Sequence, residues 1–107
     1  MKFLAFTKQR PIMINWKRYS ENRISEKFLK ELSKIPVEKR SRMERFVFKE
    51  LPEANSIFES GRVEPMKGYP SYYKARFGRY RIGLRTKNDK VVLERALHRK
   101  DIYRYFP

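Results

Sequence analysis

Two neighbouring segments of the chain alternate basic and apolar side chains. One is Tyr73-Lys74-Ala75-Arg76-Phe77 and the other is Tyr80-Arg81-Ile82-Gly83-Leu84-Arg85. Side chains of a β-strand point alternately to the two faces of a sheet, so each segment would present its cations on one face. Guanidinium groups bind phosphate oxygens through paired hydrogen bonds. The pattern therefore predicts a phosphate-binding face that carries Lys74, Arg76, Arg81 and Arg85 with no acid among them.

The whole chain is strongly basic. Its 107 residues include 27 lysines and arginines against 12 acids, a formal net charge of +15. From residue 62 to the end there are 13 basic residues against 4 acidic ones. A field of one sign favours binding over simple solvation. Nucleic acid, an acidic protein and an anionic membrane surface would all neutralise it, and we expect RNA.

The rest of the composition excludes several classes of protein. The chain has no cysteine and one histidine, which excludes disulfides and thiolate metal sites and leaves too few ligands for an ordinary zinc site. No apolar run approaches the length of a membrane span, and the apolar start is too short for a signal peptide. We expect a single cytoplasmic domain over residues 1–107, with no membrane contact.

Upstream of the alternating segments, the apolar spacing becomes that of helices. One helix is predicted over residues 25–34, with Ser25 as its N-cap, and a second over 36–51, where Pro52 should end it. Together they would form a helical hairpin. Residues 1–22 are predicted to add at most an edge strand or an extension.

Four strands are predicted to follow, joined mainly by tight turns. Gly78-Arg79 suits a two-residue hairpin turn with positive φ at its first position, and Asn88-Asp89 marks a second turn. The fold class is then α+β, a helical hairpin on one face of a small twisted antiparallel sheet. Residues 101–106 are predicted to form no more than one helical turn. The predicted strands are Val63–Lys67, Tyr72–Phe77, Tyr80–Arg85 and Val91–Leu97.

The last of these strands does not alternate cleanly. When alternate residues are taken together, Arg99 falls in the same set as Leu97 and His98 in the same set as Ala96. Both sets therefore contain apolar residues. Alternation alone therefore does not decide which face His98 or Arg99 reaches. A β-bulge near the end of the strand would bring either residue to the basic face.

Three blocks of this sequence resemble the RelE/ParE superfamily of toxins from type II toxin–antitoxin pairs. They are Met66–Tyr69, Tyr72–Gly83 and Leu97–Tyr103, and they look like the family's L-x-G, Y-R-x-R-x-G-x-Y-R and H-R-x-D-x-Y motifs in the same order. The resemblance covers roughly residues 26–106 and includes the helical hairpin.

The resemblance implies an activity and its partners. The RelE branch consists of metal-free endonucleases that cleave messenger RNA in the ribosomal A site, so no cofactor is expected. The ParE branch shares the fold and inhibits DNA gyrase. A cognate antitoxin wraps over the sheet and helices of each toxin, and the complex contacts operator DNA through the antitoxin.

The resemblance also implies roles for single residues. Arg81 would stabilise the phosphate, Arg99 would contact it and serve as the acid, and Tyr103 would orient or stack the RNA. Further cations are expected to bind RNA, and either Tyr72 or Tyr103 has a ring suited to stacking on bases. The expected RNA-binding cations are Lys67, Arg76, Arg79, Arg85 and Lys100.

The sequence leaves the identity of the general base open between two residues. In RelE toxins a lysine that serves as the base occupies the position of Arg76, and arginine is almost never deprotonated. Lys74, crowded by arginines, is one candidate, because positive neighbours make its proton easier to lose. His98 is the other, because histidine titrates near neutral pH.

Three functions remain in view at this point. The first is a ribosome-dependent messenger-RNA endonuclease that inhibits translation. The second is a gyrase inhibitor of the ParE kind. The third is a non-catalytic module that binds RNA or an antitoxin, which Arg76 favours.

Overall fold

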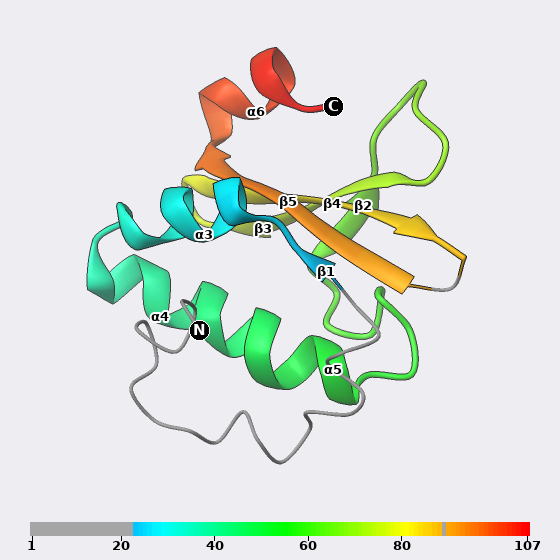
Figure 1. The fold of residues 1–107 in the computed structure, drawn as a ribbon, viewed down its shortest axis with the longest axis horizontal. Coiled ribbons are helices and arrows are strands. Elements are labelled where there is room, and N and C mark those ends of the chain that lie inside the picture. Colours follow the sequence, from blue (N-terminus) through cyan, green and yellow to red (C-terminus); the bar gives the residue numbers. More distant parts are fainter. Residues whose placement is uncertain (1–22, 89) are drawn as a thin grey trace.

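The computed structural model describes residues 23–88 and 90–107, so the edge strand predicted within residues 1–22 lies outside the described residues. Figure 1 shows a sheet with helices on both of its faces. No helix of the described part is long and apolar enough to cross a membrane. The elements are β1 (Arg23–Ile24), α3 (Glu26–Ser33), α4 (Val37–Arg45), the π-helix η2 (Phe46–Glu50), α5 (Leu51–Glu53), β2 (Val63–Pro65), β3 (Tyr72–Phe77), β4 (Tyr80–Lys87), β5 (Lys90–His98) and α6 (Arg99–Tyr105).

The five strands form one sheet in the order β1-β5-β4-β3-β2. All neighbours pair antiparallel except β1, which adds a short parallel edge next to β5. The predicted α+β arrangement is confirmed. Gly78 has φ +62°, as its place in the two-residue turn requires, and Asn88 has φ +51° in the turn before β5. The second residue of that turn, at position 89, is not described.

A bulge in the middle of β5 explains its broken alternation. Gly83 pairs with Arg95, but the next residue of β4, Leu84, pairs with Leu93, so Glu94 is an extra residue in β5. An extra residue inverts the parity of the strand from that point on. Leu93 and Ala96 can therefore both be buried on the same face of the sheet.

The two predicted helices cover one face of the sheet, α3 against β5 and α4 against β3. Ser25 caps α3 by accepting from the backbone N–H of Phe28 at 3.0 Å, as predicted. Pro52 does not end the second helix, which continues to Glu53. The π-helical turn before Pro52 widens the helix, which relieves the clash of the ring with the carbonyl four residues earlier.

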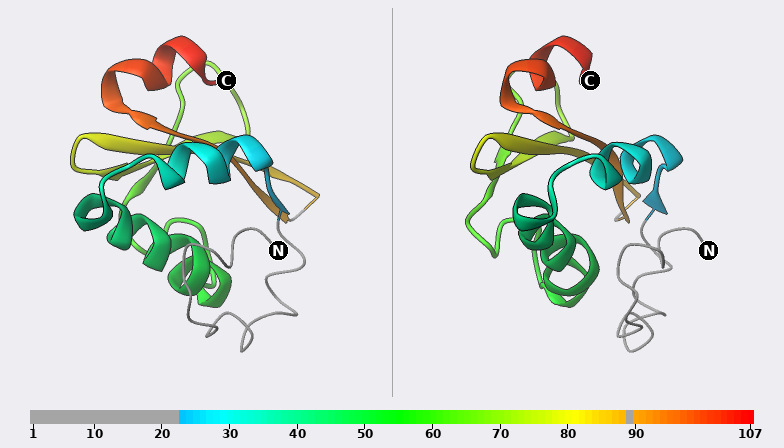
Figure 2. Two further views of the ribbon diagram at one scale, coloured as in Figure 1. Left: turned by 60° about the vertical axis from the view of Figure 1, so that its left-hand side comes forward. Right: turned by 90° about the vertical axis from the view of Figure 1, so that its left-hand side faces the viewer.

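Helix α6 lies on the opposite face of the sheet from α3 and α4 (Figure 2). It has seven residues, two turns rather than the one predicted. Ile102 and Phe106 are buried there in a second small core with Met66, and Tyr72 packs against the ring of Phe106 at 5.6 Å. This core holds α6 on the sheet, so burial of its C-terminal end stabilises a helix too short to be stable alone.

Gly83 allows Phe106 to pack directly on the sheet. A Cβ added to Gly83 would lie 2.7 Å from Cδ2 of Phe106. The ring therefore rests directly on the backbone of β4, and only glycine leaves room for it.

Candidate nucleic-acid interface

The four predicted cations of β3 and β4 all lie on the face of the sheet that carries α6. Arg76 on β3 pairs directly with Arg81 on β4, and Lys74 pairs with Gly83. Residues paired across an antiparallel ladder point to the same side. The sequence prediction that these side chains share one face is therefore correct, and Arg85, which pairs with Tyr72, lies on that face as well.

Helix α6 adds two more residues to this face. The Lys74 amine donates a hydrogen bond to the hydroxyl of Tyr103 and lies 4.8 Å from the centre of its ring. Arg99 begins the helix, and its backbone N–H donates to the carbonyl of Arg79 at 2.7 Å. We call Lys74, Arg76, Arg81, Arg99 and Tyr103 the basic cluster.

Arg81 is the most constrained member of the basic cluster. Its Nη1 donates to the carbonyls of Gly78 at 2.7 Å and Tyr80 at 2.9 Å, which anchors the guanidinium to the hairpin turn. Burial lowers the pKa of Arg81, and the charges of Arg76 and Arg99 lower it further. An anion bound among these three groups would relieve their mutual repulsion, which is the electrostatic condition for a phosphate site.

Two carboxylates on this face correct the prediction of an acid-free patch. Glu64 on β2 forms an ion pair with Arg76 at 3.4 Å, and Glu94 on β5 pairs with Arg85. The Glu64–Arg76 pair is about half exposed, so it contributes little and is easily exchanged for a phosphate. Alternation within a strand could not reveal either acid, because each lies on a neighbouring strand.

Arg85 does not join the basic cluster. On β4 it shares a face with Arg81, but Phe106 covers Gly83, the residue between the two arginines on that face. Arg85 instead lines a separate groove of about 540 Å³ together with Lys27 and Tyr105. The C-terminal end of α6 thus divides the predicted basic face into two parts.

His98 lies away from the basic cluster. It pairs with Tyr80, whose side chain shares the face of the sheet that carries α3 and α4, and the two rings meet edge to face at 5.6 Å. Its Nδ1 accepts a hydrogen bond from the backbone N–H of Lys100 at 3.2 Å, so the side chain is the N-cap of α6. The structure brings Lys74, but not His98, together with Arg81.

The other predicted contact residues surround the basic cluster. Lys67 is exposed in the loop between β2 and β3, Arg79 in the hairpin turn and Lys100 in the first turn of α6. The two candidate stacking rings differ. Tyr103 is 66% exposed and free to meet a base, whereas Tyr72 is partly buried beneath Phe106.

A family model described as the ParE toxin of the type II toxin–antitoxin system parDE matches residues 23–103 of this chain. The chain belongs to the RelE/ParE superfamily of type II toxins. The expectation drawn from the three sequence blocks is thus confirmed. The match ends at Tyr103, so it includes the whole basic cluster but not Phe106, which seats α6.

Individual proteins that match this chain carry RelE names. The chain is 38% identical over 81 residues to Toxin RelE3 of Methanocaldococcus jannaschii, covering 75% of this chain and 91% of that protein. The RelB–RelE antitoxin–toxin complex of Methanococcus jannaschii matches with a TM-score of 0.69 and 35% identity, over 79% of this chain and 99% of that chain. The RelBE2 complex of Mycobacterium tuberculosis, at 23% identity, 71% and 93% coverage and a TM-score of 0.56, shares the fold.

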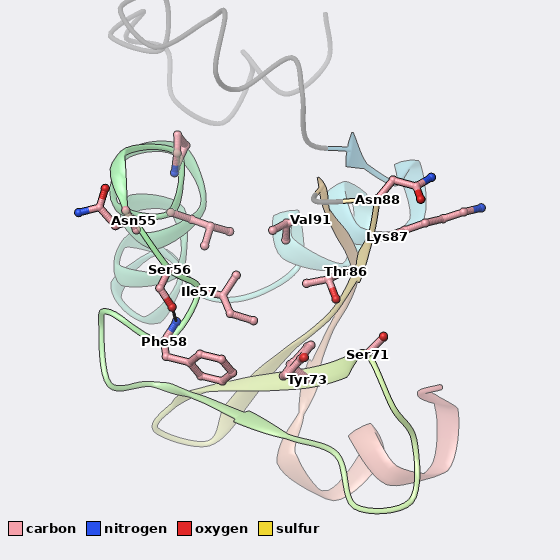
Figure 3. Close-up of a pocket in the computed structure, with 13 residues that line it drawn as sticks. Asn55, Ser56, Ile57, Phe58, Ser71, Tyr73, Thr86, Lys87, Asn88 and Val91 are labelled. Carbon is pink, nitrogen blue, oxygen red and sulfur yellow. Dashed lines mark hydrogen bonds between the residues drawn. The ribbon is translucent and has the colours of Figure 1, made fainter.

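This RelE/ParE toxin also has a groove on the other face of its sheet. Figure 3 shows it between the loop that follows α5 and the strands β3, β4 and β5, with Ile57 and Val91 pointing into it. Its volume is about 650 Å³, and Lys87 is its single charged residue among the described ones. With one charged side chain, the described lining of this groove does not suit a polyanion. No motif in the sequence predicts the groove, because one of its walls is an irregular loop.

Proposed function

We propose that this toxin is an endoribonuclease that cleaves messenger RNA on the ribosome and thereby inhibits translation. The observation that carries the proposal is the meeting of Arg81, Arg99, Lys74 and Tyr103 on one exposed face of the sheet. Two arginines, an amine and a phenol supply the charge, the proton carrier and the stacking ring that RNA cleavage needs. The relation to RelE toxins supports the same reading.

The proposed reaction is an in-line transesterification. The 2′-oxygen of one nucleotide forms a bond to the adjacent phosphorus while the bond from phosphorus to the 5′-oxygen breaks. The 2′-hydroxyl gives up its proton to a base, and the leaving oxygen takes one from an acid. Arg81 neutralises the charge that grows on the phosphate oxygens in the transition state. Because Arg81 is held by two backbone carbonyls, it needs little reorganisation during the reaction.

Lys74 is the base that the geometry favours. Its amine is hydrogen-bonded to the Tyr103 hydroxyl, so two groups that can carry a proton lie together beside the arginines. Arg76 holds its proton too firmly, and the accepting nitrogen of His98 is occupied by the helix cap. Arg99 would donate the proton to the leaving oxygen, as in the family, and its exposed position in the first turn of α6 allows that contact.

We also propose a cognate antitoxin as the protein partner in the cytoplasm. The solved RelB–RelE relative is an antitoxin–toxin complex, and nearly all of its matched chain aligns with this one. A chain with a net charge of +15 suits an acidic partner segment. Contact with operator DNA would be made through the antitoxin.

Expression of the chain in cells that carry a translated reporter, followed by primer extension on its messenger RNA, tests the proposal. Cleavage is expected within translated codons and not in a matched reporter that lacks its start codon. Arg81→Ala should lower cleavage by about 100-fold or more, because it removes a transition-state donor. Lys87→Ala, at the far end of β4, removes the same charge and should leave cleavage unchanged.

A second function has a specific observation in its favour, since the matching family model is that of a ParE toxin. Intact reporter RNA together with gyrase-dependent DNA breaks would establish inhibition of gyrase and overturn the nuclease. A third outcome is the absence of both activities with tight antitoxin binding retained. It would identify a non-catalytic binding module, in which Arg76 stands where RelE toxins have their catalytic base.

A further inference from the structure

Arg95, on β5, joins two helices that lie on opposite faces of the sheet. It pairs with Gly83 across the β4–β5 ladder, so its side chain leaves the sheet on the face that carries α6. There its Nη1 donates to the carbonyl of Tyr105, the last residue of α6, at 3.0 Å. Its Nε and Nη2 donate to the carboxylate of Glu31 on α3, at 3.1 Å and 2.6 Å. One guanidinium therefore ties the C-terminal end of α6 to a helix on the other side of the sheet (Figure 2).

The parallel edge strand β1 ends before it reaches Arg95, so the side chain can pass around the edge of the sheet. The last residue of β1, Ile24, pairs with Leu93. Glu31 lies at the same edge, where it also accepts the backbone N–H of Ala96 at 2.9 Å. The side chains of Arg95 and Glu31 are each 17% exposed, and the bonds from two nitrogens fix the plane of the guanidinium. Arg95 is thus held from α3 and directs its third nitrogen at α6.

The C-terminal end of α6 is held by two kinds of contact. Ile102 and Phe106 attach it by apolar burial, which is far less directional than a charged hydrogen bond. The last carbonyls of a helix have no partner within it, and Arg95 satisfies the one at Tyr105. Tyr103 lies two residues earlier and is largely exposed, so its place over the sheet follows the orientation of α6.

The orientation of α6 matters because the hydrogen bond between Lys74 and Tyr103 crosses from the sheet to the helix. Hydrogen bonds weaken steeply as their angle departs from linearity, and a misplacement of about 1 Å can lower a reaction rate about 100-fold. The N-terminal end of α6 is anchored separately, by the backbone N–H of Arg99 on the carbonyl of Arg79. Loosening the C-terminal end should therefore displace Tyr103 more than Arg99.

We propose that Arg95 is a positioning residue of this toxin, which holds Tyr103 against Lys74 by fixing the C-terminal end of α6 from α3. This inference deepens the proposed function and rests on it, because Lys74 and Tyr103 are the pair of proton-carrying groups in that reaction. Arg95 acts through Tyr103 and not on the RNA directly. A lysine in its place would keep the charge, but its single nitrogen could not reproduce the bidentate pair with Glu31 together with the bond to Tyr105.

A double-mutant cycle of Arg95→Lys and Tyr103→Phe, measured by single-turnover RNA cleavage on ribosomes, tests the proposal. Arg95→Lys should lower the cleavage rate about tenfold, the same decrease as Tyr103→Phe, because both remove the bond from Lys74. The two together should lower it by at most about twofold more, whereas independent effects would multiply to about 100-fold. Urea unfolding of each protein gives the folded fraction by which the rates are corrected.

Arg40→Lys is the matched control, because Arg40 makes the same kinds of contact at the joint between α3 and α4. It donates from Nη1 to the carbonyls of Ser33 at 3.1 Å and Ile35 at 3.4 Å, and it pairs with Glu44. This joint lies on the other side of the sheet from α6 (Figure 2). Arg40→Lys should therefore lower the free energy of unfolding and leave the cleavage rate per folded molecule unchanged.

Nuclear Overhauser effects between the Lys74 side chain and the Tyr103 ring report the contact without any cleavage. They should be present in the wild type and in Arg40→Lys, and weakened in Arg95→Lys. Glu31→Gln keeps an acceptor at the sheet edge and removes the charge that orients Arg95, so it should weaken them as well. It takes the place of Arg95→Lys in the cycle if that variant does not fold.

The outcomes decide the proposal in either direction. Rate decreases that multiply in the double variant would show that Arg95 does not act through Tyr103, and the proposal would be wrong. It would be wrong as well if Arg95→Lys kept both the cleavage rate and the Overhauser effects of the wild type. If the wild type cleaves no RNA, the proposed function fails, but the Overhauser effects still decide whether Arg95 positions Tyr103.

Discussion

The amine of Lys74 donates a hydrogen bond to the hydroxyl of Tyr103, which joins the middle of β3 to the second turn of α6. The same amine lies 4.8 Å from the centre of the Tyr103 ring. The two residues are 29 positions apart in the chain, so they meet only because Ile102 and Phe106 seat α6 on the sheet. Assembly of the basic cluster therefore depends on the docking of the last helix.

The ring and the hydroxyl of Tyr103 should contribute separately, the ring to RNA binding and the hydroxyl to the rate of cleavage. Tyr103→Phe keeps the stacking ring and removes the hydroxyl, so RNA affinity should persist. The cleavage rate should fall about tenfold, because the hydrogen bond from Lys74 is removed. Tyr103→Ala should also weaken RNA binding by about 1–3 kcal/mol. Single-turnover cleavage and filter binding of the two variants would measure this, and equal decreases of affinity in both variants would contradict a stacking role.

His98 should prove to be a structural residue. His98→Asn keeps a side-chain acceptor at the N-cap of α6, so stability and cleavage should both remain near those of the wild type. His98→Ala removes the cap and should cost about 0.5–2 kcal/mol of unfolding free energy, with cleavage per folded molecule retained. Urea unfolding and single-turnover cleavage are the measurements. A decrease of about 100-fold or more in the cleavage rate of His98→Asn would instead make His98 the base.

Local patterns predicted the strands and helices well, because period and turn chemistry act within a few residues. The hairpin at Gly78 and the helix cap at Ser25 were both visible in the sequence for this reason. The bulge at Glu94 was not, because it is a property of the pairing between β4 and β5. The parallel edge β1 was missed as well, since two residues carry no readable period.

The candidate site was predictable where its residues lie on one hairpin. Lys74, Arg76 and Arg81 were placed correctly by alternation alone. Alternation also put Arg85 on the correct face, but its separation from the other three cations depends on Phe106. The face of His98 was left open, because its position depends on the cap of α6 and on pairing between segments far apart in the chain. The length of α6 was underestimated for the same reason, because burial rather than helix propensity stabilises it.

The Arg40–Glu44 pair should make stability depend on pH. Burial raises the pKa of Glu44 above its ordinary value of 4.5, and the charge of Arg40 only partly offsets this. The folded protein thus holds that proton more tightly than the unfolded chain. The resulting stabilisation is present below pH 4.5 and disappears as the pH rises through the pKa of the folded state.

Unfolding in urea across this pH range would show the effect. The free energy of unfolding of the wild type should fall relative to that of Glu44→Gln as the pH rises above about 4.5. Glu38→Gln, on an exposed and unpaired carboxylate of the same helix, is the matched control and should follow the wild type. A constant difference between the wild type and Glu44→Gln at every pH would show that the carboxyl does not titrate differently in the fold.

Because Phe106 packs closely on Gly83, the effect of Gly83→Ala on the free energy of unfolding should depend on whether Phe106 is present. In the wild type, Gly83→Ala drives a methyl group to within 2.7 Å of the Phe106 ring, and such overpacking should cost about 1–3 kcal/mol of unfolding free energy. In a Phe106→Ala background the ring is gone, so the same substitution should be neutral or stabilising by about 0.4–1 kcal/mol through the entropy of the unfolded chain. Urea unfolding of the four proteins in this double-mutant cycle measures the coupling between the two positions. RNA cleavage should be impaired in each variant in which α6 no longer packs on the sheet. An identical cost of Gly83→Ala in both backgrounds would mean that Phe106 does not rest on β4.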